Sequence, residues 1–243
     1  MNKFKAALRI LFVLCIIALV VVSIVKMQNR KCSGIQVNIN YDGEHPHLDE
    51  QSIITLLQQK NISILESELK DIPLEEISEV LENNNFIQKV ENIDFKGTIL
   101  MINVRLKTLV LHIYPEKGEQ FFMDEDGLLL PFSSLIKEKI MVANGDIKKD
   151  TAQLKVLYNI ASNIRKNQFC RAQFCQIYVN KNQDIELIPV IGQHTIYFGK
   201  EDRIEEKLSN IENVYTNALS YSGMDQYKEL DVRFQNRVIA KQR

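Results

Sequence analysis

The longest apolar stretch of the chain covers residues 6–25, where only Arg9 and Ser23 interrupt a run of apolar side chains. Its core, residues 10–22, contains no charged side chain. A helix of about 20 residues is roughly 30 Å long, which matches the hydrocarbon thickness of a bilayer. Inside lipid the backbone must satisfy its own hydrogen bonds, so an isolated span is helical. The pattern predicts a single transmembrane helix with its core over residues 10–25.

Basic residues flank this stretch on both sides, with Lys3, Lys5 and Arg9 before the core and Lys26, Arg30 and Lys31 after it. A cleaved secretory signal is the alternative interpretation, but the length of the stretch and the lack of a small-residue cleavage site favour an uncleaved anchor. The short charged tail over residues 1–9 favours a cytoplasmic N-terminus and an exported body. Residues 26–33 are polar and basic and are interpreted as a linker.

Alternating apolar and polar positions then predict a module over residues 34–108. The expected elements are a strand over 35–41, a helix over 50–60, a helix over 73–82, and strands over 86–95 and 99–106. Asp49 is placed to cap the first helix, because its carboxylate can accept an N–H of the first turn. Pro73 suits the start of the second helix, where its missing N–H has no partner to lose. The order strand, helix, helix, strand, strand predicts a compact α+β module.

Residues 109–243 predict a larger mixed β domain with two helices. Strands are expected over 110–114, 120–123, 128–130, 176–179, 185–189 and 195–198, and helices over 151–166 and from Asp202 to Ala218. Near the C-terminus, Leu230, Val232 and Phe234 alternate with polar residues, and residues 238–240 follow. A terminal strand at a sheet edge exposes unpaired N–H and C=O groups, so another chain could add there. The alternative is that this strand closes its own sheet.

Composition narrows the possible functions. With 30 basic and 31 acidic residues, the balanced charge does not predict nucleic-acid binding. Nine glycines and five prolines are too few for long disordered linkers. Four cysteines do not form a disulfide framework, and a bond between Cys170 and Cys175 is left open.

Candidate chemical sites are few. His45 and His47 lie among acidic residues, but a solvent-exposed turn is the simpler interpretation, so no metal site is predicted. Residues 124–127 are interpreted as a hairpin turn, because Leu135 stands where a calcium loop needs a glutamate. The sequence has no nucleophile-elbow, zinc-protease, P-loop or dinucleotide motif. We therefore expect no catalytic residue, no cofactor and no small-molecule substrate.

Several stretches together resemble the FtsQ/DivIB family of bacterial cell-division proteins, in the form found in the Bacteroidota. They are residues 72–77 and 85–90, 122–127 with 130–131, 176–180 with 186–189, and Leu-Asp-Val-Arg-Phe at 230–234, which is similar to a family pattern Leu-Asp-Leu-Arg-Tyr. The chain departs from the family at residues 105–108, where Arg-Leu-Lys-Thr replaces a frequent Gln-Arg-x-Pro. It departs again at residues 235–237, where many members carry glycine.

The resemblance implies a POTRA-type module over 34–108 and an FtsQ-type β domain over 109–243. It implies a non-enzymatic protein of the inner membrane, with a cytoplasmic N-terminus and a periplasmic body concentrated at the division septum. Such proteins hold FtsB- and FtsL-type partners, which add a strand to the C-terminal edge, so that septal peptidoglycan synthesis starts at midcell. Arg233 and Phe234 are then expected as interface side chains, and Leu230 and Val232 as core anchors. The full set of expected partner-binding residues is Leu230, Asp231, Val232, Arg233, Phe234, Val238, Ile239 and Ala240.

Two other functions remain possible at this stage. POTRA modules also occur in envelope transport and outer-membrane assembly factors, which is the main alternative. A membrane-anchored envelope hydrolase is the other.

Overall fold

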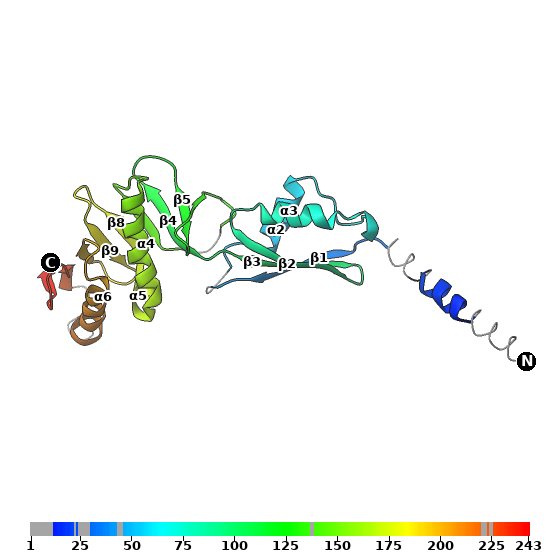
Figure 1. Ribbon diagram of the computed structural model, residues 1–243. Helices are drawn as coiled ribbons and strands as arrows, with labels where there is room; N and C mark the ends of the chain where they lie inside the picture. Colours follow the sequence, from blue (N-terminus) through cyan, green and yellow to red (C-terminus); the bar gives the residue numbers. More distant parts are fainter. Residues whose placement is uncertain are drawn as a thin grey trace, which may run out of the picture. The chain divides into compact units, whose positions relative to one another are not determined.

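The computed structural model describes residues 12–21, 23, 30–42, 46–136, 139–219, 223 and 226–243. The chain forms two compact units, Met1–Leu106 and Lys107–Arg243 (Figure 1). The sequence-based boundary lies two residues later, between residues 108 and 109.

Unit 1 contains a three-stranded sheet with two helices on one face (Figure 1). The strand order is β1-β3-β2, with β1 parallel and β2 antiparallel to β3. The elements are β1 (Gly34–Asn40), α2 (Glu50–Gln59), the 3₁₀ turn η1 (Leu69–Asp71), α3 (Leu74–Glu82), β2 (Ile87–Lys96) and β3 (Ile99–Leu106). The predicted order of two helices between the first and second strands is confirmed, with η1 as an addition.

Local chemistry explains these elements. Asp49 caps α2 as predicted, because its Oδ1 accepts the Ser52 N–H at 2.8 Å. Every second residue of β3, from Leu100 to Leu106, is buried, which matches the two-residue period of a strand with one covered face. The β2–β3 hairpin turns at Gly97, whose φ of +69° suits glycine.

Unit 2 contains one nine-stranded sheet with helices on one side (Figure 1). Its strands are β4 (Leu109–Pro115), β5 (Phe121–Asp124), β6 (Leu129–Pro131), β7 (Val142–Gly145), β8 (Phe174–Val179), β9 (Ile185–Pro189), β10 (Thr195–Gly199), β11 (Tyr227–Asp231) and β12 (Ile239–Gln242). The spatial order is β12-β11-β10-β9-β8-β7-β4-β5-β6. The helices are α4 (Thr151–Lys166), α5 (Gln168–Gln173) and α6 (Ile204–Asn213), and the π-helical η2 (Val214–Leu219) continues α6.

The α+β class and the mixed β domain are confirmed, but the prediction of only two helices in unit 2 is wrong. After α4 the chain starts α5, because Asn167 Oδ1 accepts the Cys170 N–H at 2.8 Å and caps a new helix. The expected helix from Asp202 is divided into α6 and η2, and α6 begins after Arg203. Asp202 does not cap it but accepts a hydrogen bond from Lys207 Nζ at 2.8 Å.

A central strand, β7, was not predicted. It lies between β4 and β8 and runs parallel to both. It ends at Gly145, where φ is +106° and an added Cβ would stand 2.1 Å from the Val179 carbonyl oxygen. Only glycine fits this close approach of two strands.

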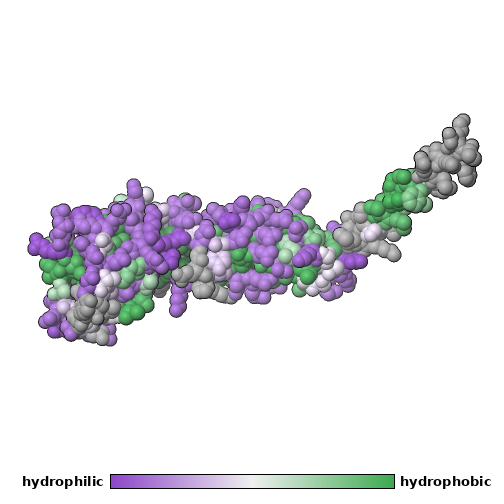
Figure 2. All heavy atoms as spheres, turned by 90° about the horizontal axis from the view of Figure 1, so that it is seen from below, coloured by the Kyte–Doolittle hydropathy of each residue, from purple (hydrophilic) through white to green (hydrophobic). Residues whose placement is uncertain are grey.

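Residues 12–21 form a helix whose side chains are all apolar and exposed, shown in green in Figure 2. Several positions of the predicted 10–25 span, the tail over 1–9 and residues 26–29 of the linker lie outside the described residues. Within the part of the chain that the structure describes, none of the helices is both long and apolar enough to cross a bilayer.

Candidate partner-binding edge

The sheet of unit 2 has two edge strands, β6 and β12. The main-chain groups on the outer side of an edge strand have no neighbouring strand, and another chain can pair with them. β6 has three residues and ends on Pro131, which has no N–H to donate. β12 contains no proline. Of the two edges, β12 is the better suited to strand addition.

The C-terminal residues form a hairpin instead of one long strand. The alternation over 230–234 predicted a continuous strand, but β11 ends at Asp231 and residues 232–238 turn the chain. β11 pairs in parallel with β10 and antiparallel with β12, so it is an interior strand. The open edge therefore lies in β12, after the stretch that carried the sequence motif.

The hydrogen bonds of β11 show which groups of β12 face outward. The Val232 N–H donates to the Tyr197 carbonyl at 3.1 Å, so Val232 and, two positions earlier, Leu230 direct their main-chain groups at β10. Leu230 lies opposite Ala240. This pair cannot exchange hydrogen bonds, and the N–H and C=O of Ala240 project away from β11. Ala240 thus offers one donor and one acceptor to an incoming strand.

The side chains of β12 are all exposed. Ile239 is 48% exposed and shares one face with Lys241, which forms a 3.3 Å ion pair with Glu229 of β11. An added strand would meet these two side chains on that face and the small Ala240 on the other. The predicted site stops at Ala240, but the strand continues to Gln242; four residues are too short a run for alternation to mark the whole element.

The structure separates the predicted partner-binding residues by burial. Leu230 and Val232 are fully buried at 0% exposure, and Val238 is partly buried against the same core. Phe234 is 43% exposed at the start of the turn. The predicted residues that present substantial side-chain surface are Arg233, Phe234, Ile239 and Ala240.

Arg233 is held against its own strand. Its Nε and Nη2 donate to the Asp231 carboxylate at 2.9 and 2.6 Å. These hydrogen bonds lower the pKa of Asp231 and raise the pKa of Arg233 relative to their ordinary values. The guanidinium carbon lies 5.7 Å from the centre of the Tyr197 ring. The side chain also packs over Gly199, where an added Cβ would stand 2.8 Å from Arg233 Cγ. Arg233 therefore fixes the end of β11.

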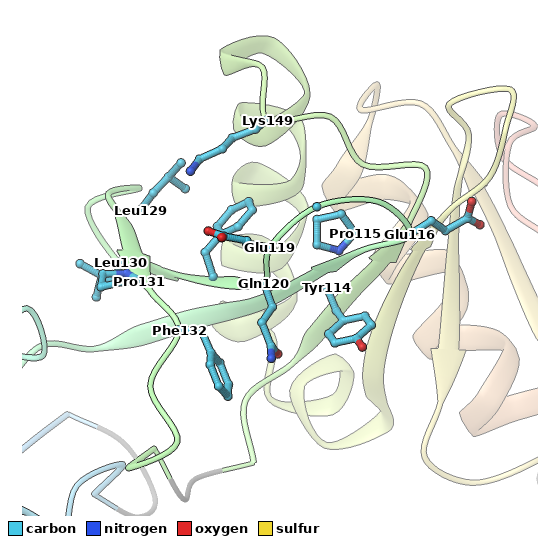
Figure 3. Close-up of a pocket in the computed structure, with 12 residues that line it drawn as sticks. Tyr114, Pro115, Glu116, Glu119, Gln120, Leu129, Leu130, Pro131, Phe132 and Lys149 are labelled. Carbon is cyan, nitrogen blue, oxygen red and sulfur yellow. The ribbon is translucent and has the colours of Figure 1, made fainter.

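A second surface feature lies beside the other edge strand, β6. It is a pocket of about 780 Å³, and Figure 3 shows Tyr114, Gln120 and Phe132 among its lining residues. Lys149 Nζ lies 5.3 Å from the centre of the Phe121 ring, a cation–π contact. Among the described residues, none that line the pocket is a histidine, serine or cysteine. Its lining combines apolar side chains with the charged side chains of Glu116, Glu119 and Lys149.

The described residues considered for metal or redox chemistry form neither a metal-binding group nor a disulfide. His47 is not in an exposed turn as predicted: it is 3% exposed, and burial lowers its pKa to about 4. His45 lies outside the described residues. Groups of three or more metal-binding side chains are not found among the described residues. Cys170 and Cys175 are both free thiols, and burial raises the pKa of Cys170 to about 12.

Comparison with protein-family models gives two matches. The model described as FtsQ/DivIB, C-terminal related, matches residues 108–241, which is more than half of the chain. The model described as a POTRA-like domain matches residues 30–105. No curated protein matches the sequence.

Proposed function

The chain belongs to the FtsQ/DivIB family, and from this membership we propose that it is a non-enzymatic scaffold of the bacterial division machinery. Its β12 edge receives a strand from an FtsB- or FtsL-type protein. The assembly so formed helps to start septal peptidoglycan synthesis.

The open side of β12 carries this proposal. Ala240 directs its N–H and C=O away from the sheet, and the rest of β12 leaves its side chains exposed. Main-chain pairing supplies affinity, while the alternating side chains of the edge set specificity. The competing edge at β6 is blunted by Pro131.

We also propose that the protein is anchored in the inner membrane, with a cytoplasmic N-terminus and the bulk of the chain, including the sheets of both units, in the periplasm. The apolar sequence over residues 6–25 supports an anchor. The described helix over 12–21 supports it too, because a helix that exposes only apolar side chains gains by transfer into lipid.

Photocrosslinking in living cells tests the proposed edge. A photoreactive amino acid at position 239 should capture an FtsB- or FtsL-type protein. The matched control is position 129, because Leu129 is exposed on the opposite edge strand. Capture of that partner from position 129 and not from 239 would contradict the proposal.

The division role has a separate test. Depletion of the protein should give filamentous or chained cells, because septal synthesis would start late or fail. Normal septation after full depletion would contradict the proposed role whatever the binding edge.

A further inference from the structure

Arg203, which precedes α6, and Glu206 in the first turn of α6 hold the turn between β11 and β12. Arg203 Nη2 donates to the Arg233 carbonyl oxygen at 2.8 Å. The Asn236 N–H donates to Glu206 Oε1 at 3.1 Å. Arg203 and Glu206 also approach each other, with 3.5 Å between Nη1 and Oε1. The turn backbone therefore accepts a hydrogen bond from one member of an ion pair and donates one to the other. We call this pair, Arg203 and Glu206, the α6 clamp.

Backbone geometry indicates that the clamp is a built feature of the fold. Arg203 has φ of +50° and Asn236 has φ of +56°, the left-handed region that residues with a side chain rarely adopt. Such conformations persist where surrounding contacts fix them. Arg203 precedes α6 but makes no side-chain capping bond to it. Its guanidinium is directed to the turn and to the neighbouring carboxylates instead.

Apart from the clamp, β12 is held by its pairing with β11, by the Lys241–Glu229 ion pair and by the hydrogen bonds of Arg243 to Gln193 and Gln226. Its four residues are all exposed, so they bury little apolar surface. An edge strand that frays must be ordered again when a partner binds, and that ordering weakens the measured affinity. Contacts that fix the turn reduce this loss, because they keep the first residue of β12 at its place beside Asp231.

We propose that Arg203 and Glu206 are positioning residues that hold β12 ready for strand pairing. This inference rests on the proposed function, since it concerns the same receiving edge. It assigns a role in binding to two residues at the start of α6 that lie outside the strand itself.

Hydrogen exchange of the full-length protein tests the clamp without any partner. Arg203→Ala and Glu206→Ala should each speed exchange of the β11-facing amides within residues 239–242, those of Ile239 and Lys241, by roughly threefold to tenfold, the range for loss of one hydrogen bond. Exchange in β8 and β9 should stay unchanged. Glu206→Gln should keep most of the protection, because its amide oxygen can still accept the Asn236 N–H. Glu205→Ala is the matched control, because Glu205 is exposed in the same first turn of α6.

Crosslinking from position 239 to the FtsB- or FtsL-type protein completes the test. Faster exchange together with a lower crosslink yield in both alanine variants supports the proposal. Unchanged exchange over 239–242 in both variants overturns the clamp. Faster exchange with an undiminished crosslink yield overturns the positioning role. If the wild-type protein captures no such partner, the proposed function is refuted. The exchange data then test only whether the clamp holds β12.

Discussion

Replacing Ala240 by proline separates the partner-binding role of β12 from its role in the fold. The side chain of Ala240 is exposed, and its N–H points away from β11. Proline removes that N–H and places a ring on the open side of the strand. Edge strands tolerate proline where the N–H faces solvent, so the hairpin should still form.

The expected effects differ in size. The free energy of unfolding should fall by less than about 1 kcal/mol, because no hydrogen bond to β11 and no buried contact is lost. Binding should weaken by about 2 to 3 kcal/mol, since one interstrand hydrogen bond is lost and a partner carbonyl is left unpaired. That corresponds to a roughly 30- to 150-fold weaker Kd.

Calorimetric titration with the periplasmic segment of an FtsB-type protein measures the loss, and urea unfolding measures stability. Ala240→Val is the matched control, because it keeps the N–H and adds a side chain suited to strands. Ile239→Pro provides the contrast: its N–H faces β11, so this variant should free β12 from the sheet. Equal affinities for Ala240→Pro and Ala240→Val would refute strand addition at this edge.

Three further predictions concern the fold. Gly145→Ala should lower the free energy of unfolding of unit 2 by about 2 kcal/mol or more in urea, because its Cβ would meet the Val179 carbonyl. Gly97→Ala has open space around the added Cβ and should lower the free energy of unfolding clearly less. Equal losses in the two variants would contradict the packing argument. Lys207→Ala should lower the free energy of unfolding by about 2 to 4 kcal/mol, since this side chain is 1% exposed and its Nζ donates to the Lys200 carbonyl. A loss below about 1 kcal/mol would show that this contact is not needed for stability. The pKa of His47 is about 4 when folded against 6.5 in the unfolded chain, so the unfolded chain binds the proton first as the pH falls. Stability of unit 1 should therefore be full above about pH 6.5 and fall by about 3 kcal/mol towards pH 4. Amide exchange in α2 follows this fall, and His47→Phe should remove it; an unchanged pH profile in that variant would contradict the assignment.

Unit 1 could be predicted closely from sequence because its signals are local. The alternation from Leu100 to Leu106 indicates a strand with one covered face. Asp49 indicates the start of a helix, because it bonds to Ser52, three residues away. Each of these patterns is complete within a few residues. The chain then needs only to bring two helices onto one side of a small sheet.

The central strand of unit 2 could not be predicted in this way. β7 is four residues long, and its neighbours β4 and β8 come from distant parts of the sequence. Its pairing is set by those neighbours and by the close approach at Gly145, which the local sequence presents only as a turn residue. The start of α5 could have been predicted from the sequence, since asparagine at position 167 is a favourable N-cap residue.

The sequence predicted an open strand edge near the C-terminus. In the structure this edge is β12, which begins at Ile239, after the motif over residues 230–234. Alternation from Leu230 to Phe234 indicates a strand, but β11 ends at Asp231, where Arg233 bonds to the Asp231 carboxylate and its carbonyl accepts from Arg203 instead of from a strand. These are contacts between side chains and between strands, which a period-two pattern does not contain. The turn residues that bond to Arg203 and Glu206 are likewise joined only in the folded chain.

Residue-resolved amide exchange of Ala240, in the free protein and in its complex with an FtsB-type partner, tests the central claim most directly. In the free protein this N–H faces solvent, so it should exchange fast beside the slower Ile239. In the complex it should be slowed by about a hundredfold or more, because it becomes part of an interstrand ladder. An Ala240 amide that exchanges equally fast in the saturated complex would contradict strand addition at β12.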